Sequence, residues 1–457
     1  MKAMNHNPPA QDGAVYNTIP LDKRGTPSTQ QIDFQKMSLE NLATELLRQI
    51  LLNLDSSDLH DAALVCRSWL PLCREIHWSR ISLNININRI KLVSILRKQG
   101  DSTSIPRQIL GITIEEDNVL EYAEDEEIIT AWRDDLLMIL NHFDSIDNLR
   151  ITFLDLPKFS QAPEQILRPD MVVSQLVIQR LTAKRLSDVL PYVLSPSLEF
   201  LGLGSCEFLD KEDTAVDDRL LSTDPKPLAR LKHLVVFGDC GPLLPALVES
   251  ASLDNLKTIV TVCQDKYLTS RLVKASSFSL RALALEFSNE GKYLNGPFNG
   301  WKLIDLAEAI FDLSTVGPLE NLSIDISSYR RVEPLLSNLV QTVSSVQRLE
   351  HLFINCSPVI IDSDAEHENA VPLWKALDSH LAQLPGLEYV AFTLVITPGI
   401  AMFAGSGLGD AVEKFKGDVL NYAEAKLPAC QGKKLIQVKD LVGSWTVQPF
   451  PDAKLSE

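Results

Sequence analysis

The residues that come nearest to a catalytic or cofactor-binding motif form a glycine-rich run, Gly405-Ser406-Gly407-Leu408-Gly409. The run follows an apolar, strand-like segment and precedes a helix-like stretch at 410–426. A glycine-rich turn between a strand and a helix can hold a phosphate at the helix N-terminus. Here Asp410 replaces the third glycine of such a loop, and its carboxylate would repel a phosphate while capping the helix. The run therefore predicts a loop that opens a helix, and a nucleotide-binding enzyme using 405–409 is kept as a remote alternative.

Residue types that bind metals or act as nucleophiles are dispersed along the chain. The sequence contains no G-x-x-x-x-G-K-[ST], no H-E-x-x-H and no C-x-x-C, and its eight histidines stand far apart. The seven cysteines also stand singly, which is typical of reduced thiols in a cytoplasmic or nuclear protein. We therefore expect a protein that is not an enzyme and that uses neither a cofactor nor a metal.

The composition is that of a soluble globular protein with room for two or three domains: 457 residues, 45 % apolar and 23 % charged. A net charge of −17 argues against nucleic acid or an anionic membrane as a general partner, because both select for basic surfaces. The first 35 residues are polar and lack the apolar core of a signal peptide. The longest apolar run, 389–405, is interrupted by Pro398-Gly399, so we expect no membrane span.

The segment from Leu42 to Trp78 has the hydrophobic pattern of three short helices. In the first, at 42–54, apolar residues cover about half of the helix circumference, whereas a surface helix needs a stripe of only about 100°. A turn at 55–58 leads to a second helix at 59–65, and a third apolar stretch follows at 69–78. A unit of about 40 residues is marginally stable alone. The surplus apolar surface therefore predicts a partner, within the chain or outside it.

The spacing of this segment resembles an F-box, which reads roughly L-P-x-E-L-L-x-x-I-L-x-x-L, then D-L, then V-C-R-x-W. The resemblance covers residues 37–80, with Ala43 in the place of the usual proline. It implies contact with a Skp-type adaptor of a cullin ubiquitin ligase. The residues that match the motif are Leu42, Ala43, Leu46, Ile50, Leu54, Leu59, Val65 and Trp69. Some of them must pack the core of the module instead, and the sequence does not divide the two sets.

From Trp78 onward, a motif of apolar, two spacers, apolar, one spacer, apolar recurs at intervals of 24 to 40 residues. The alternating half of each motif predicts a short strand whose apolar side faces inward. Helices are expected between the copies, at 135–146, 303–313, 332–346 and 373–384. The copies are Trp78/Ile81/Leu83, Ile109/Ile112/Ile114, Leu149/Thr152/Leu154, Val173/Leu176/Ile178, Leu198/Leu201/Leu203, Leu231/Leu234/Val236, Leu256/Ile259/Thr261, Leu280/Leu283/Leu285, Leu319/Leu322/Ile324, Leu349/Leu352/Ile354 and Leu387/Val390/Phe392.

One strand and one helix per unit resembles an irregular leucine-rich-repeat solenoid, an α/β fold in which stacked strands form one curved parallel sheet. The asparagine ladder of regular repeats is missing, and only Cys206 falls on the position it would occupy. An ordinary α/β domain with a mostly parallel sheet remains the alternative. The expected organisation is a disordered segment at 1–35, an F-box at 36–80, a leucine-rich-repeat-like solenoid at 81–445 and a tail at 446–457.

Together the two resemblances imply a substrate-recognition subunit of a Skp–cullin–F-box ubiquitin ligase, of a type numerous in fungi. A scaffold protein without a role in ubiquitination is the alternative. The protein target is unknown, and we expect it to contact outward strand positions that combine charges with nearby aromatic residues. Acidic segments at 115–127 and 362–368 could steer a basic target. The predicted contact residues are Glu199, Lys232, Arg281, Asn321 and Glu350, with Phe200, Phe237, Phe287 and Phe353 close by.

Overall fold

In the computed structural model, the chain forms two compact units, residues 1–73 and residues 74–457. The structure describes residues 43–54, 56–83, 87–99, 109–115, 126–159, 171–210, 226–262, 266–286, 313, 315–325, 332–346, 348–356, 370–396 and 408–442.

The first unit is helical, as the sequence predicts. It contains α1 (Thr44–Leu52) and α2 (Ser56–Val65), and α3 (Leu70–Ser79) begins in it. The side chains that form its buried interior come from all three helices: Leu47, Leu51, Leu59, Ala62, Leu72 and Cys73. Burial raises the pKa of the Cys73 thiol, which keeps it protonated and unreactive.

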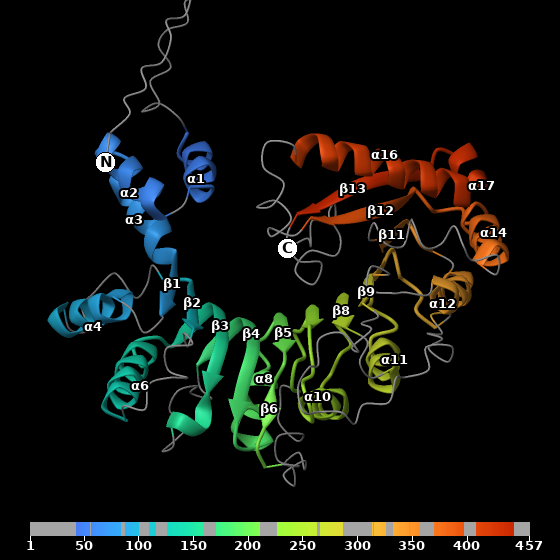
Figure 1. The fold of residues 1–457 in the computed structure, drawn as a ribbon. Helices are drawn as coiled ribbons and strands as arrows, with labels where there is room; N and C mark the ends of the chain where they lie inside the picture. The colour runs from blue at the N-terminus through green and yellow to red at the C-terminus, as the bar shows by residue number, and fades with distance from the viewer. Residues whose placement is uncertain are drawn as a thin grey trace, which may run out of the picture. The chain divides into compact units, whose positions relative to one another are not determined.

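The second unit is built on a 13-stranded sheet in which every pair of neighbouring strands is parallel (Figure 1). Sheet order follows chain order from β1 to β13, except that β6 pairs with the end of β4. The strands are β1 (Arg80–Leu83), β2 (Gly111–Glu115), β3 (Ser145–Asp155), β4 (Val172–Ala183), β5 (Phe200–Gly204), β6 (Glu207–Phe208), β7 (His233–Val236), β8 (Thr258–Val262), β9 (Ala282–Glu286), β10 (Asn321–Asp325), β11 (His351–Cys356), β12 (Tyr389–Ile396) and β13 (Ile436–Val442).

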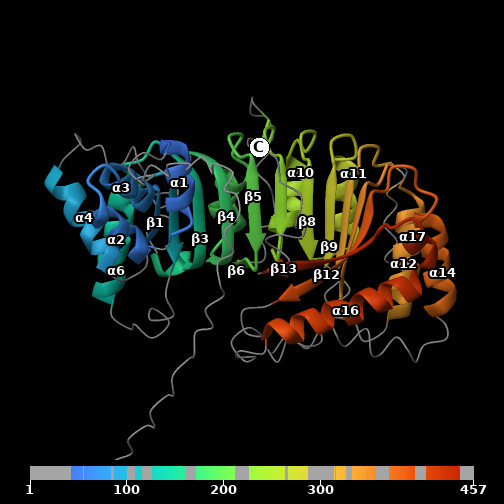
Figure 2. The ribbon, with the colours of Figure 1, turned by 90° about the horizontal axis from the view of Figure 1, so that it is seen from above.

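Helices connect many of these strands, and those between the central and later strands lie along one face of the sheet (Figure 1). Figure 2 shows α16 running beside β12 and β13, which it contacts. The helices of this unit are α4 (Ile87–Gln99), α6 (Glu126–Leu140), α8 (Leu190–Val193), α10 (Leu243–Ser250), α11 (Lys266–Ala275), α12 (Val332–Ser344), α14 (Ala370–Leu381), α16 (Leu408–Lys426) and α17 (Pro428–Gly432), with short 3₁₀ turns η4 (Leu156–Phe159) and η5 (Leu186–Asp188).

The apolar residues of the recurring motif lie in register beneath this helix-covered face. The middle residues of consecutive motifs pair along the sheet, and those of β5, β7, β9, β10 and β11 are completely buried. They join the helices in a single hydrophobic core. This confirms the predicted equivalence of the five central leucines, which are Leu201, Leu234, Leu283, Leu322 and Leu352.

Two of the predicted positions are wrong. The copy placed at Leu149/Thr152/Leu154 starts three residues too late, because Ile112 and Ile114 of β2 pair with Leu149 and Ile151. The long strand β3 has apolar residues in both frames, so the sequence alone permits either. The helix predicted at 135–146 is α6, which begins nine residues earlier and ends at Leu140, and residue 146 belongs to β3.

The remaining predictions concern the later helices, two further strands and the two ends of the chain. The helices expected at 332–346 and 373–384 are present as α12 and α14, whereas β6 and β13 are not anticipated. The predicted segments 1–35 and 446–457, and the helix at 303–313 apart from its last residue, lie outside the described residues.

A buried aspartate joins the end of the sheet to its helices. The Asp378 carboxylate, in α14, accepts hydrogen bonds from the backbone N–H groups of Ala429 (2.8 Å) and Cys430 (2.9 Å) at the start of α17. These N–H groups have no partner within their own helix. Burial and the neighbouring Asp378 raise the pKa of the Cys430 thiol to about 12. Asp378 therefore holds the helix that precedes β13.

We predict that Asp378→Ala lowers the stability of this part of the chain by roughly 2–4 kcal/mol, because it leaves two N–H groups without an acceptor. Asp378→Asn, which keeps one acceptor, should have a smaller effect. Thermal melting of the two variants, with the exposed Asp418→Ala as a control, measures the difference. Equal melting temperatures for all three variants would contradict this role.

Candidate protein-interaction surfaces

Large apolar side chains remain exposed on the helical unit. Leu46 and Ile50 of α1 are 52 % and 49 % exposed, and Leu64 and Val65 at the end of α2 are each 74 % exposed. Leu46 and Ile50 are four residues apart and therefore share one face of the helix. Leu47 and Leu51, one position further along, point into the core instead. The structure thus divides the apolar half of α1 into a core-facing row and a solvent-facing row.

The other predicted adaptor contacts have different environments. Ala43 is exposed and has φ −55°, within the range that a proline ring imposes, so alanine preserves the helix-opening backbone. Leu54 and Trp69 are half-buried, whereas Leu59 is only 6 % exposed and belongs to the core. Leu42 lies outside the described residues.

The exposed Leu52 and Leu64 are not among the predicted contacts, although their apolar character in a short amphipathic unit was a usable signal. The turn between α2 and α3 is held by hydrogen bonds that position Trp69. Its N–H donates to the Cys66 carbonyl at 3.0 Å, and its own carbonyl accepts from the Cys73 N–H at 2.8 Å. The exposed apolar residues therefore lie on a unit with fixed turns, as expected of a preformed docking surface for another protein.

Residues 39–84 match the F-box-like family. This F-box-like domain contains all three helices α1–α3 and every exposed apolar side chain described above. A search of curated proteins gave no match to the chain. The domain supports an F-box protein that binds a Skp-type adaptor, a class of typically non-catalytic subunits.

We predict that Leu46→Asp with Ile50→Asp weakens adaptor binding at least about a hundredfold, or roughly 2.8 kcal/mol, because a charge at an apolar interface is costly. The matched control is Thr44→Asp with Gln49→Asp, which adds the same charge to exposed polar positions of α1. Calorimetry with purified adaptor measures affinity, and thermal melting verifies folding. Wild-type affinity in the first variant would contradict the prediction.

A second candidate surface lies where the strands of the sheet begin. Seven charged residues immediately precede β5 and β7–β12, and we call them the edge row: Glu199, Lys232, Lys257, Arg281, Glu320, Glu350 and Glu388. Each backbone N–H from Lys232 onward donates to the carbonyl of the preceding member, at 2.8 to 2.9 Å. Four of the five predicted target contacts belong to this row. The fifth, Asn321, lies one position further, in β10.

Ion pairs link several members of the edge row and their neighbours. The Glu199 carboxylate accepts from Lys232 Nζ at 2.8 Å and also pairs with Arg230. The hydrogen bond from Lys232 is the main cause of the lowered pKa of Glu199, which burial partly opposes. Arg281 pairs with Glu320 at 3.4 Å. These groups are largely solvated, so each pair contributes little stability and the charges remain available to a partner.

The histidine and tyrosine beside the acidic members form a ring cluster. His351 stacks on Tyr389 with ring centroids 4.3 Å apart, and its Nδ1 lies 2.7 Å from Asn321 Oδ1. Its Nε2 lies 3.2 Å from a carboxylate oxygen of Glu388. His351 therefore contacts both the predicted Asn321 and Glu388, a member of the edge row.

The predicted aromatic residues are not equally accessible. Phe200 and Phe237 are half-buried, and the Phe237 ring occupies the space where a side chain on Gly204 would lie. Phe353 is fully buried, so it cannot contact a target directly. Phe287 lies outside the described residues. Phe278, which the sequence did not single out, is 94 % exposed three residues before Arg281.

The face of the sheet opposite the main hydrophobic core holds buried polar side chains. Asn355 and Thr393 are neighbours in register on β11 and β12, and both are fully buried. The amide of Asn355 and the hydroxyl of Thr393 have no hydrogen-bond partner among the described residues. Such groups are ordinarily satisfied by water or a ligand.

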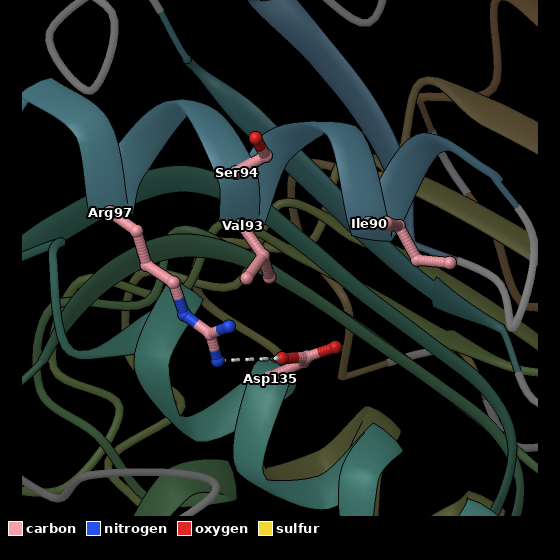
Figure 3. A pocket seen from close by; sticks show the side chains of 5 residues that line it. All are labelled: Ile90, Val93, Ser94, Arg97 and Asp135. Atoms are coloured by element: carbon pink, nitrogen blue, oxygen red, sulfur yellow. Dashed lines mark hydrogen bonds and ion pairs between the residues drawn. The ribbon is translucent and has the colours of Figure 1, made fainter.

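A pocket lies between α4 and α6 (Figure 3). It has a volume of about 330 Å³ and is lined by Ile90, Val93, Ser94, Arg97 and Asp135. Its two charged side chains, Arg97 and Asp135, lie 3.5 Å apart and pair with each other. The Ser94 hydroxyl in the same lining points away from Asp135 in Figure 3.

Among the described residues, no group of histidine, cysteine or acidic side chains could hold a metal ion. In the same part of the chain, no helix is long and apolar enough to cross a membrane. Gly405–Gly407 lie outside the described residues, and α16 begins at Leu408, so Asp410 lies in its first turn.

Proposed function

We propose that this protein is the substrate-recognition subunit of a Skp–cullin–F-box ubiquitin ligase. The F-box-like domain would bind the Skp-type adaptor, and the sheet unit would hold a protein target near the ubiquitin-loaded conjugating enzyme. The chain itself would contribute proximity, because tethering raises the effective concentration of target lysines. It would need no catalytic group, cofactor or metal of its own.

The observation that carries this proposal is the exposed apolar row of Leu46 and Ile50 inside a domain that matches the F-box-like family. A small helical unit loses stability by exposing such side chains unless another protein covers them. The proposed contacts also include Ala43, Val65 and the half-buried Trp69. Leu64 joins them because it is exposed next to Val65.

We infer that the sheet unit is an irregular leucine-rich-repeat-like solenoid, of the kind found in fungal F-box proteins. Support comes from its sequential, all-parallel strand order and from the motif leucines stacked in register. A doubly wound α/β sheet instead reverses its strand order partway along. In a stacked array the inward apolar residues form the core, so a target would contact the outward positions and the strand edges.

The compartment follows from the redox state proposed for the cysteines. Cys66, Cys73, Cys206, Cys240 and Cys430 are free thiols, and all of them except Cys66 are buried. Together with the dispersed spacing of all seven, this favours the cytoplasm, the nucleus or both.

Reconstituted ubiquitination distinguishes the ligase from a scaffold. We expect the full-length chain to co-purify with the Skp-type adaptor and its cullin, and a target cross-linked to the sheet unit to receive ubiquitin in the assembled complex. Transfer should fall to background in the Leu46→Asp/Ile50→Asp variant and persist in the Thr44→Asp/Gln49→Asp control. An assembled complex that binds the target but never modifies it would favour the scaffold alternative.

A further inference from the structure

Six of the seven members of the edge row divide by charge into two halves, and the seventh, Glu199, precedes them and pairs with Lys232. From β7 to β12 along the sheet, the row has the three cations Lys232, Lys257 and Arg281, and then the three carboxylates Glu320, Glu350 and Glu388. Because sheet order follows chain order here, like charges are neighbours in space as well. Adjacent like charges repel and are not favoured by folding, so their grouping requires another reason.

The spacing of these charges is fixed by the backbone. The hydrogen bonds of 2.8 to 2.9 Å between successive members hold them at the separation of neighbouring strands, which is about 4.8 Å. From β7 to β12 the row therefore spans about 24 Å, the length of roughly seven residues of extended peptide. The row has the dimensions of a binding site for a short linear segment.

The middle residue of each half, Lys257 or Glu350, differs from its neighbours in its ion pairing within the described part of the chain. Lys232 pairs with Glu199, Arg281 pairs with Glu320 at the junction of the halves, and Glu388 contacts His351. Lys257 and Glu350, in contrast, have no ion-pair partner among the described residues. Each half thus retains at least one charge for an external partner.

The two halves of the row have opposite effects on the pKa of a side chain beside each of them. The pKa of His233 is lowered mainly by burial and further by Lys257 and Lys232, as expected beside a positive patch. The pKa of Tyr389 is raised mainly by burial and further by Glu388, as expected beside a negative patch. These smaller contributions have the signs expected from the nearest members of each half, and Glu199 partly opposes the effect of the two lysines on His233.

We propose that the edge row binds an extended peptide segment of the target in which an acidic block and a basic block follow one another. The acidic block lies on Lys232, Lys257 and Arg281, and the basic block lies on Glu320, Glu350 and Glu388. This inference rests on the proposed function, because it takes the sheet unit as the target-binding part.

Two synthetic peptides of identical composition test the proposal against the full-length chain. One has four glutamates, a glycine and four lysines in blocks, and the other alternates the same residues, so both have zero net charge. Fluorescence anisotropy at about 0.01 M salt, where the Debye length is about 30 Å, should show the block peptide binding at least about tenfold more tightly. The preference should vanish near 1 M salt, where that length is about 3 Å.

Charge exchange in the protein provides the second measurement. The variant Lys257→Glu/Glu350→Lys keeps the net charge but makes the row alternate, so it should lose the preference for the block peptide. A matched control, Lys274→Glu/Glu413→Lys, exchanges charges on α11 and α16 and should keep it. Equal binding of both peptides to wild type, or no binding of either, would overturn the proposal.

If the variant fails to fold, the neutral Lys257→Gln/Glu350→Gln replaces it and should reduce the preference. Adaptor affinity, measured in parallel, is expected to stay unchanged, so failure of the charge row and failure of the ligase assignment are separate results.

Discussion

Each strand of this sheet can bury its apolar side only beside the next strand and beneath a helix, and the rest of the structure depends on that stacking. Leu234 of β7, for example, lies between Leu201 and Ile259 in register, and all three are completely buried. A single strand–helix unit has no such neighbours and could not exclude water. The same stacking fixes the backbone ladder on which the edge row is placed.

Stacking also explains why chemistry is assigned to surfaces and not to an internal cleft. The inward side chains are used for the core, and the largest among the fully buried residues, such as Trp132 and Trp374, fill the space under the helices. What remains for recognition is the beginnings of the strands, where backbone hydrogen bonds hold charged side chains in a line. The helical unit presents apolar side chains on its surface for a different reason. Its core is too small to enclose all of its leucines, so several of them remain exposed.

The sequence predicts the sheet unit well because the strand register follows from a repeated apolar spacing. It fails where that spacing is ambiguous, as in β3, whose apolar residues fit two frames. Each member of the edge row follows the first apolar position of its motif and immediately precedes a strand. That rule gives Glu199, Lys232, Arg281 and Glu350, and applied throughout it also gives Lys257, Glu320 and Glu388. Within α1, by contrast, apolar residues occupy both the core-facing and the solvent-facing rows, so hydrophobicity alone could not separate Leu46 from Leu47.

Hydrogen–deuterium exchange of the full-length chain, with and without a purified Skp-type adaptor, tests the central claim most directly. If the F-box-like domain is the docking unit, amide exchange should slow across α1 and α2, while the strands β5–β12 keep their unbound rates. Unchanged exchange in α1 and α2, or protection appearing on the sheet instead, would contradict the account.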